Sequence, residues 1–310
     1  MTDISPAHPF RIGTRGSPLA LAQAHMTAAA LRAAHGWGED HIILVTVQTS
    51  GDRIQDRALA DIGGKALWTK ELDRALLDGE IDCAVHSMKD VETIRPERIA
   101  IAAMLERAAV EDRLLGAISI TELKRDALVG TSSPRRAAQV RRLNPVVRPV
   151  VFRGNVATRL AKLEQGEVDA TLLAAAGLDR LGMTDVGVTI PLDQMLPAPA
   201  QGAVGIECRA DDEPTRALLA VINHGATFAC VMAERALLLG LGGTCHSPVA
   251  ALARMEGEAI LLKAEILSAD GAEHVEGAVR LTPGETEPAT ALGRDLLERA
   301  SPAIRALFHG

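Results

Sequence analysis

FRIGTRGSPLALAQ, residues 10–23, is the stretch that decides the fold. Phe10–Thr14 has the composition of a short strand, Ser17 is a suitable helix N-cap, and Pro18 suits the first helical position. An Ala- and Leu-rich helix is predicted from there to about Ala34. A short apolar strand that leads directly into a helix is typical of α/β proteins with parallel sheets.

The same arrangement returns at residues 127–143. Ala127–Val129 is apolar, Ser133 can cap a helix, and Pro134 would open it. The segments GTRGSPLALAQ and GTSSPRRAAQ align with one gap, which favours an internal duplication. The alternative is that the chain uses a common strand-turn-helix pattern twice.

A second repeated pattern also favours duplication. A predicted helix at Ala66–Leu77 precedes a predicted strand at Glu80–Val85, and a helix at Val156–Glu164 precedes a strand at Glu167–Leu172. The apolar run Leu172–Leu178 suits a buried strand. The first two thirds of the chain therefore predict two related α/β units with mostly parallel strands.

The last third predicts a small α+β domain. An apolar helix would begin at Glu234-Arg235, and Asp270-Gly271 is a hairpin signal between two predicted strands. A final amphipathic helix is predicted at about Pro288–Leu307. The predicted strand Ala203–Cys208 would return the chain to the first unit.

Composition narrows the class of protein. The chain has 310 residues, which suggests two or three domains, and its net charge of −7 disfavours nucleic-acid binding. Four Phe, two Trp and no Tyr leave few platforms for base stacking. No signal pattern or membrane-length apolar run is present, and the four cysteines are widely spaced. A reducing cytoplasm without zinc or disulfides is expected.

Residues 127–163 are locally basic, in contrast to the negative net charge of the whole chain. The window has no acidic residue, and its basic residues are Arg135, Arg136, Arg141, Arg142, Arg148, Arg153, Arg159 and Lys162. Helix N-termini favour anions, so arginines placed there oppose the helix dipole unless an anion is bound. A ligand with several carboxylates or phosphates is predicted. The alternative is a solvated basic face, for which the best candidates are Arg141, Arg142 and Arg148.

The segment VHSMKD, residues 85–90, follows a predicted strand. Ligands in open α/β sheets bind beyond the carboxyl ends of strands, which makes Lys89 and Asp90 candidates for acid–base chemistry. A surface ion pair is the alternative for these two residues. His86 can equally be a satisfied core histidine.

Cys245 differs from the other cysteines because it lies in the Gly-rich turn LGGTCHSP, residues 241–248. Cys83, Cys208 and Cys230 fit strand or helix patterns and are expected in the core. A thiol in an approachable turn suits a reactive or modified group. No P-loop, dinucleotide fingerprint or metal site is complete.

Together these motifs resemble the porphobilinogen deaminase family, also called hydroxymethylbilane synthases. The resemblance covers nearly the whole chain, from about Arg11 to the C-terminal helix. The motifs, in order, are RIGTRGSPLALAQA (11–24), GDRIQDRALADIGGKALWTKEL (51–72), IDCAVHSMKDV (81–91), VGTSSPRRAAQ (129–139), FRGNVATRLAKL (152–163), LLAAAGLDRLG (172–182) and QGAVGIE (201–207).

The resemblance implies a transferase of tetrapyrrole, and so haem, biosynthesis. Such an enzyme joins four porphobilinogen molecules head to tail, releases ammonia at each joining, and frees hydroxymethylbilane with water. It is primed by a dipyrromethane cofactor that a thioether holds on one cysteine, here Cys245. Each pyrrole ring carries an acetate and a propionate, so a growing chain gains two carboxylates per ring. This chemistry would explain arginines at the anion sites.

The resemblance also implies a role for individual residues. Asp90 would be the catalytic carboxylate, with Lys89 as its charged neighbour. Besides Cys245, the cofactor-binding residues would be Lys89, Asp90, Thr131, Ser132, Ser133, Arg135 and Arg136. The substrate-binding residues would be Arg15, Ser17, Arg153, Arg159 and Arg180. Lys65 and Trp68 would belong to a flap, although Trp68 can also be a partly buried helix residue.

The implied fold is α/β, with two doubly wound lobes like those of periplasmic binding proteins and a small α+β third domain. Domain 1, with the catalytic Asp and the flap, would comprise residues 1–104 and 199–221. Domain 2, with the Arg-rich anion site, would comprise residues 105–198. Domain 3 would comprise residues 222–310 and carry the cofactor cysteine on a loop. The protein is expected to be a cytoplasmic monomer without nucleic-acid or membrane partners.

Several residues depart from the family pattern, namely Gly16, Ala66, Trp68, Ala200, Thr244 and Ser247. None of them removes a functional group invoked above. Two other functions compete with the transferase. A non-catalytic module that binds polycarboxylates would need neither Asp90 nor Cys245. An acyl transferase with Cys245 as nucleophile would need a base, for which His246 is a weak candidate.

Overall fold

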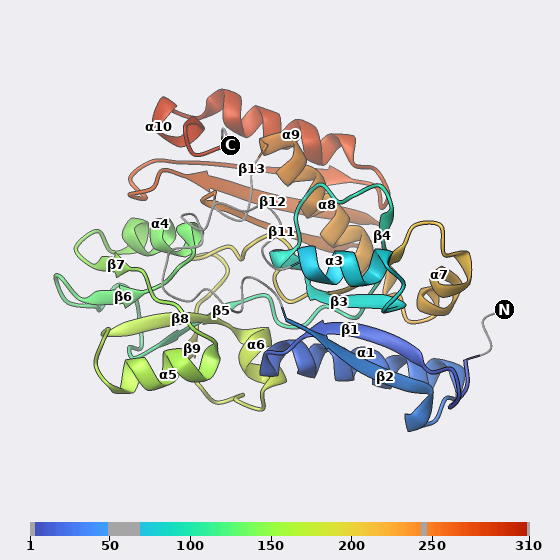
Figure 1. Ribbon diagram of the computed structural model, residues 1–310. Coiled ribbons are helices and arrows are strands. Elements are labelled where there is room, and N and C mark those ends of the chain that lie inside the picture. Colours follow the sequence, from blue (N-terminus) through green and yellow to red (C-terminus); the bar gives the residue numbers. More distant parts are fainter. Residues whose placement is uncertain (1–3, 49–68, 243–246, 309–310) are drawn as a thin grey trace. The chain divides into compact units, whose positions relative to one another are not determined.

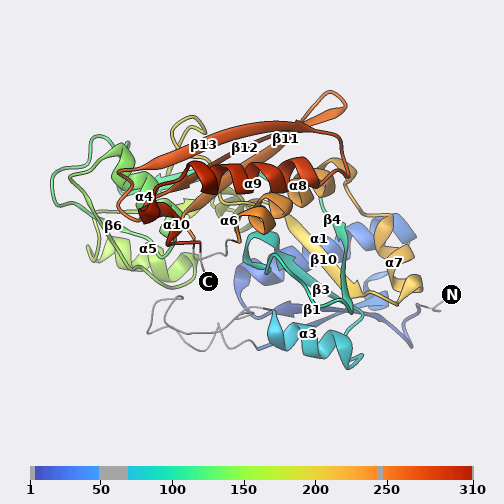
Figure 2. The same cartoon turned by 90° about the horizontal axis from the view of Figure 1, so that it is seen from above.

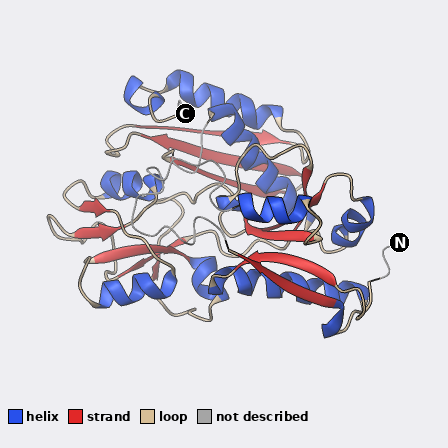
Figure 3. Cartoon of the chain, in the orientation of Figure 1, coloured by secondary structure: helices blue, strands red, loops and turns tan. Residues whose placement is uncertain are grey.

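The structure is a computed structural model that describes residues 4–48, 69–242 and 247–308. Within this part of the chain there are two compact units. The first holds residues 4–48, 69–108 and 203–228, and the second holds residues 109–202, 229–242 and 247–308. Figure 1 follows the chain through its elements, and Figure 3 shows helices beside each of the sheets.

The first unit is built on a five-stranded sheet with the order β2-β1-β3-β10-β4. Its strands are β1 (Phe10–Arg15), β2 (Ile42–Val47), β3 (Cys83–Ser87), β4 (Ile99–Met104) and β10 (Val204–Arg209). β1 pairs in parallel with β2 and β3, whereas β10 is antiparallel to β3 and β4. The predicted return of the chain to the first unit is therefore confirmed, since β10 enters this sheet.

Helices cover both faces of this sheet, as Figure 2 shows for α1 (Pro18–His35) and α3 (Lys70–Leu77). Successive side chains of a strand point to opposite faces. Cys83 and Val85 of β3 accordingly pack in the core on the α1 side, and Ala84 packs in the core on the α3 side. The unit is completed by η1 (Glu39–His41), η3 (Met88–Asp90) and α7 (Glu213–Ala220).

The second unit contains a sheet of matching topology, with the order β7-β6-β8-β5-β9. Its strands are β5 (Asp112–Leu115), β6 (Leu128–Gly130), β7 (Arg148–Val150), β8 (Ala170–Ala174) and β9 (Val188–Thr189). Its helices are α4 (Pro134–Leu143), α5 (Val156–Glu164) and α6 (Ala175–Arg180). In both sheets three parallel strands adjoin one antiparallel strand, β10 or β5, which pairs in turn with a fifth strand antiparallel to it. This correspondence agrees with the predicted duplication.

The second unit also contains the antiparallel sheet β11-β12-β13. Its strands are β11 (Val249–Glu256), β12 (Ala259–Leu267) and β13 (His274–Leu281), and one apolar core joins them to α8 (Gly225–Leu241), α9 (Glu287–Arg299) and α10 (Pro302–Arg305). The predicted hairpin is confirmed, because β12 and β13 pair around Asp270-Gly271. The two sheets of five strands and this third α+β part agree with the predicted fold class.

Three local predictions are corrected. Glu234-Arg235 lies inside α8 rather than at its start. The charge of Glu234 can be buried there because its carboxylate accepts hydrogen bonds from the backbone N–H groups of Ala200 and Ala253. The run Leu172–Leu178 is divided between strand β8 and helix α6. The predicted last helix is two helices, separated at Ala300-Ser301, where Ser301 caps α10.

Among the described residues, no single helix has both the length and the apolar composition that a membrane span requires. The bent pair α7 and α8, whose axes differ by 115°, passes that test only when the two helices are joined.

Candidate functional site

Arg15 and Ser17 lie where β1 leads into α1. Arg15 is the last residue of the strand, and the Ser17 hydroxyl accepts a hydrogen bond from the Ala20 N–H at 3.3 Å. This cap satisfies one of the free N–H groups that a helix leaves at its start. The predicted strand, cap and Pro18-led helix are confirmed, and they hold both side chains at one edge of the sheet.

A small pocket in the first unit brings several predicted residues together. Its lining includes Arg15 and Ser17 from the start of α1 and Asp90 from η3. His86 and Ser87, at the end of β3, also line it, and the Gln23 amide donates to the Ser87 hydroxyl at 2.7 Å. Lys89 is half-buried beside Asp90 but is not among the described residues that line this pocket.

The turn that carries Asp90 is packed against β10. Met88, the first residue of η3, is buried against Gly205, where an added Cβ would lie 2.0 Å from the Met88 sulfur. A side chain at Gly205 would therefore force the buried Met88 side chain to move. Gly205, in the motif QGAVGIE, thus leaves room for the Met88 side chain two residues before Asp90, a contact that no local pattern predicts.

Behind the pocket lies a buried array of charges centred on Arg95. Its guanidinium donates to both oxygens of Glu207, at 2.8 and 2.9 Å, and to Asp73 at 2.5 Å and Glu92 at 2.8 Å. His86 Nε2 lies 3.2 Å from a Glu207 oxygen. These contacts tie the segment after Asp90 to α3 and β10. Sequence reasoning missed the array because Asp73 and Glu207 lie 22 and 112 residues from Arg95 along the chain.

Burial opposes the ionisation of Glu207, but its hydrogen-bonding and electrostatic interactions with His86 and Arg95 outweigh it and lower its pKa from 4.5 to about 2. A carboxyl whose pKa falls on folding stabilises the fold above its unfolded pKa. We expect Glu207 to add on the order of 3 kcal/mol near pH 7, all of it lost as the pH falls from about 4.5 to 2.

This expectation is tested by denaturing the wild type and Glu207→Gln with urea at a series of pH values. The stability difference between them should be largest near neutral pH and should shrink below about pH 4.5. Glu97→Gln, a matched change at an exposed site of the same unit, should leave the curve unchanged. A constant difference from pH 7 to pH 3 would show that the Glu207 charge does not stabilise the fold.

In the second unit, hydroxyl groups organise the start of α4. The Ser133 hydroxyl accepts from the Arg136 N–H at 3.4 Å as the N-cap, and the Thr131 hydroxyl accepts from the Ser133 N–H at 3.1 Å. The Ser132 hydroxyl donates to the Phe152 carbonyl at 2.9 Å. Capping thus accounts for the positions of Thr131 and Ser133, as the sequence allows.

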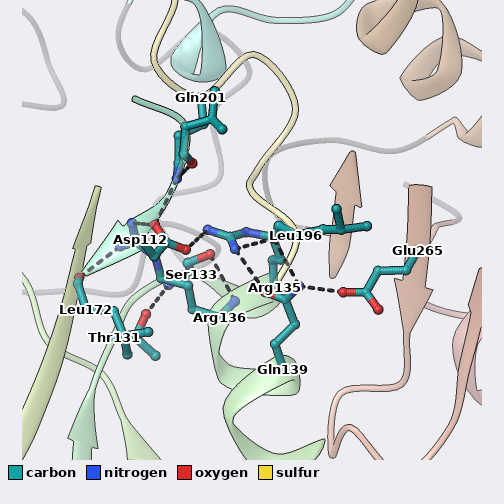
Figure 4. Close-up of polar contacts among 11 residues, drawn as sticks. Asp112, Thr131, Ser133, Arg135, Arg136, Gln139, Leu172, Leu196, Gln201 and Glu265 are labelled. Carbon is teal, nitrogen blue, oxygen red and sulfur yellow. Dashed lines mark hydrogen bonds and ion pairs between the residues drawn. The ribbon is translucent and has the colours of Figure 1, made fainter. Parts of the chain in front are cut away.

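Arg135 and Arg136 share one buried carboxylate, that of Asp112 in β5 (Figure 4). The distances are 2.8 Å from Arg135 and 2.6 Å from Arg136, and the Gln201 amide donates to the same carboxylate at 2.9 Å. Burial opposes ionisation of Asp112, but the two guanidinium groups outweigh it and hold its pKa well below the usual range. Asp112 lies outside the acid-free window of residues 127–163. The chain itself thus supplies one of the carboxylates that these arginines bind, where a ligand was predicted to supply them.

Positive charge still exceeds negative charge around Arg159. Burial, together with the charges of Arg136 and Arg153, lowers the pKa of Arg159 to about 10. Arg153 Nη1 and Arg136 Nε are buried without a hydrogen-bond partner. Buried donors without partners are rare in folded proteins and indicate a missing acceptor. The three arginines thus form a cluster suited to an added anion.

The remaining predicted residues have different settings. Arg180, at the end of α6, donates to the Gly202 carbonyl at 2.7 Å, and its Nε is buried without a partner. Arg141 is half-buried and donates to the Ala269 carbonyl, and Arg142 lies 3.4 Å from Glu265. Arg141 and Arg142 are thus partly exposed, and Arg148 is exposed as expected. Lys65, Trp68 and Cys245 lie outside the described residues.

Comparison with known proteins identifies the family. Residues 10–217 match the family model "Porphobilinogen deaminase, dipyromethane cofactor binding domain", and residues 228–301 match "Porphobilinogen deaminase, C-terminal domain". Among solved structures, an ancestral cationic amino acid solute binding protein aligns with 68% of this chain and 86% of its own, at 14% identity and a TM-score of 0.42.

Curated relatives agree over almost the full length. The porphobilinogen deaminase of Sphingopyxis alaskensis is 59% identical over 98% of each chain. That of Paracoccus denitrificans is 50% identical over 94% of each chain. Two family models in order, and relatives matched from end to end, agree with the motifs and with the anion-binding geometry. The chain therefore belongs to the porphobilinogen deaminase family.

Proposed function

We infer that this chain performs the reaction of its family. It joins four porphobilinogen molecules head to tail, releases ammonia at each joining, and yields hydroxymethylbilane for tetrapyrrole biosynthesis. The observation that carries this inference, beyond the family assignment, is the cluster of Arg136, Arg153 and Arg159 with its unpartnered buried donors. A non-catalytic polycarboxylate-binding module is not favoured, because family and relatives are deaminases.

The residues of the second unit fit a dipyrromethane cofactor. Each of its two rings carries two carboxylates, and each carboxylate needs donors with matching geometry. Arg136 and Arg153 have buried nitrogen atoms without partners, and Arg135 Nε is a third. The hydroxyls of Thr131, Ser132 and Ser133 lie at the start of α4, whose dipole favours negative charge. When bound, the cofactor supplies the pyrrole on which the chain grows.

Asp90 is assigned the catalytic role in the first unit. Loss of ammonia leaves positive charge on the substrate pyrrole, and a fixed carboxylate can stabilise that charge. Ring coupling then releases one proton, which the same carboxylate can accept. Arg15 and Ser17 line the pocket with Asp90 and are assigned to the substrate carboxylates. Lys89 is assigned a supporting role, as a cation beside Asp90 that attracts carboxylates.

Arg153, Arg159 and Arg180 are assigned to the carboxylates of substrate and growing chain, and Lys65 and Trp68 to a flap.

We assign residues 1–104 and 199–221 to domain 1, 105–198 to domain 2 and 222–310 to domain 3. The entry of β10 into the first sheet supports the division of domain 1 along the chain. We further propose a cytoplasmic monomer whose partners are porphobilinogen and its oligomers, without nucleic acid or membrane.

The covalent attachment is tested by intact-protein mass spectrometry. Wild-type protein from cells that make porphobilinogen is expected to carry the added mass of one dipyrromethane, and Cys245→Ser is expected to lack it. Cys230→Ser, a matched change at a buried cysteine of α8, should keep the adduct. An unmodified wild type, or an adduct that persists in Cys245→Ser, would contradict the attachment to Cys245.

A further inference from the structure

A buried carboxylate on β12 contacts the helix that carries the cofactor-binding arginines. Glu265 is 3% exposed, and its Oε1 accepts a hydrogen bond from the Gln139 amide of α4 at 2.5 Å. Its Oε2 lies 3.4 Å from Arg142. Figure 4 shows the Glu265 side chain directed toward Gln139. Burial of a carboxylate is costly, so its partners are expected to matter.

Glu265 and the Leu196 carbonyl together determine which way the Gln139 amide faces. The amide nitrogen donates both to Glu265 and to the Leu196 carbonyl, at 3.0 Å. Both partners can only accept, so the nitrogen has to face them and the amide oxygen has to face away. That oxygen accepts from Arg135 Nη1 at 2.9 Å. Without the Glu265 charge, the amide would lose its strongest reason to keep this orientation.

Arg135 is then held on two sides. Its Nη1 donates to Gln139 and to the Leu196 carbonyl, and its Nη2 donates to Asp112. Its Nε is buried without a hydrogen-bond partner. The guanidinium therefore keeps one donor in a defined direction while its other contacts fix the plane of the group.

A second contact holds β12 and α4 at a fixed spacing. Gly271, in the turn after β12, has a φ of +73°, and a Cβ there would lie 2.1 Å from the Ala138 carbonyl oxygen. Arg141 donates to the Ala269 carbonyl of the same turn at 2.9 Å. The hairpin thus touches α4 one residue before Gln139, which keeps Glu265 within hydrogen-bond distance of it.

We propose that Glu265 and Gln139 are positioning residues for the cofactor, which orient Arg135 so that its Nε meets a dipyrromethane carboxylate. The inference rests on the proposed function. It gives the β11-β12-β13 sheet a part in cofactor binding, because the strand acts on the cofactor through Gln139 and Arg135. An apolar pair at these two positions could pack well, but it could not orient a guanidinium.

The test measures cofactor loading rather than turnover. Apoprotein from cells that cannot make porphobilinogen is mixed with porphobilinogen, and the adduct is followed over time by intact mass. Glu265→Gln should load about tenfold more slowly, because the Gln139 amide is no longer held by a charge. Glu276→Gln is the matched control, since Glu276 lies opposite Glu265 in the sheet but is exposed. It should load at the wild-type rate.

Exchange of the two side chains separates positioning from a general loss of structure. In the double variant Gln139→Glu with Glu265→Gln, the new amide can donate to the new carboxylate, which can still accept from Arg135. Loading should return to within about threefold of wild type. If Glu265→Gln does not fold, Gln139→Met tests the same relay, because it removes the acceptor of Arg135 while Arg142 still faces Glu265.

The results distinguish a failure of the relay from Glu265 through Gln139 to Arg135 from a failure of the proposed function. Slow loading by Glu265→Gln or Gln139→Met, with recovery in the exchanged variant, supports the relay. Wild-type loading rates in either folded single variant, or a folded exchanged variant that still loads slowly, would overturn it. A wild-type apoprotein that never gains the adduct would instead contradict the proposed function itself.

Discussion

Asp90→Ala is expected to lower turnover by about 10²- to 10⁴-fold while the protein stays folded and loaded with cofactor. Asp90 lies half-buried in the pocket that Arg15 and Ser17 also line. Its carboxylate would stabilise the positive charge that develops when ammonia leaves and would accept the proton released at coupling. The measurement is kcat with porphobilinogen as substrate, together with the intact mass.

Two further variants make this result specific. Asp211→Ala removes an exposed carboxylate of the same unit and should leave kcat unchanged. Asp90→Glu keeps the charge but moves it by one methylene, so it should retain more activity than Asp90→Ala. Turnover of Asp90→Ala within about twofold of wild type would remove Asp90 from the mechanism.

Asp112→Ala is expected to cause the largest loss of stability, about 3–5 kcal/mol. Asp112 is 2% exposed and is the shared partner of Arg135 and Arg136. Its removal would leave two buried guanidinium groups without this counter-charge, and the Gln201 amide would lose an acceptor. Urea denaturation of the wild type and the variant at neutral pH measures the difference.

Asp179→Ala is the matched control for this prediction. Asp179 pairs with Arg113 at 2.8 Å in the same unit, but its side chain is 33% exposed. Because solvent screens this partly exposed pair, the control should lose much less stability than Asp112→Ala. Equal stabilities of Asp112→Ala and Asp179→Ala would show that burial of the Asp112 pair does not matter.

Much of the local structure could be predicted from the sequence. The strand, cap and helix around Ser17 and those around Ser133 lie where capping and Pro preferences indicate. Helix Val156–Glu164 and the hairpin at Asp270-Gly271 also follow from short-range patterns. The position of Glu234 in its helix was predicted wrongly. A charged residue suggests a helix start, unless it is known that its carboxylate accepts hydrogen bonds from distant backbone N–H groups.

The sites could be predicted only in part. The arginine-rich window pointed to an anion, but it did not reveal that Asp112 already pairs with Arg135 and Arg136. The sequence likewise gave no sign that Arg95 binds Glu207, which is 112 residues away. His86 was left open between a core and a functional role, and its place in both the pocket and the charge array depends on the pairing of β3 with β10.

By itself, the sequence determined the helix starts, the strand pattern, the excess of arginine and the family. The helix starts and the strand pattern depend on interactions between residues close in the chain. The excess of arginine and the family motifs can be read directly from the sequence. Only the tertiary structure decided which charges meet. Asp112 reaches α4 because β5 joins the sheet beside β8, and Glu265 reaches it because β12 packs near the same helix. Partners of buried charges are set by which strands adjoin, so they do not follow from local order along the chain.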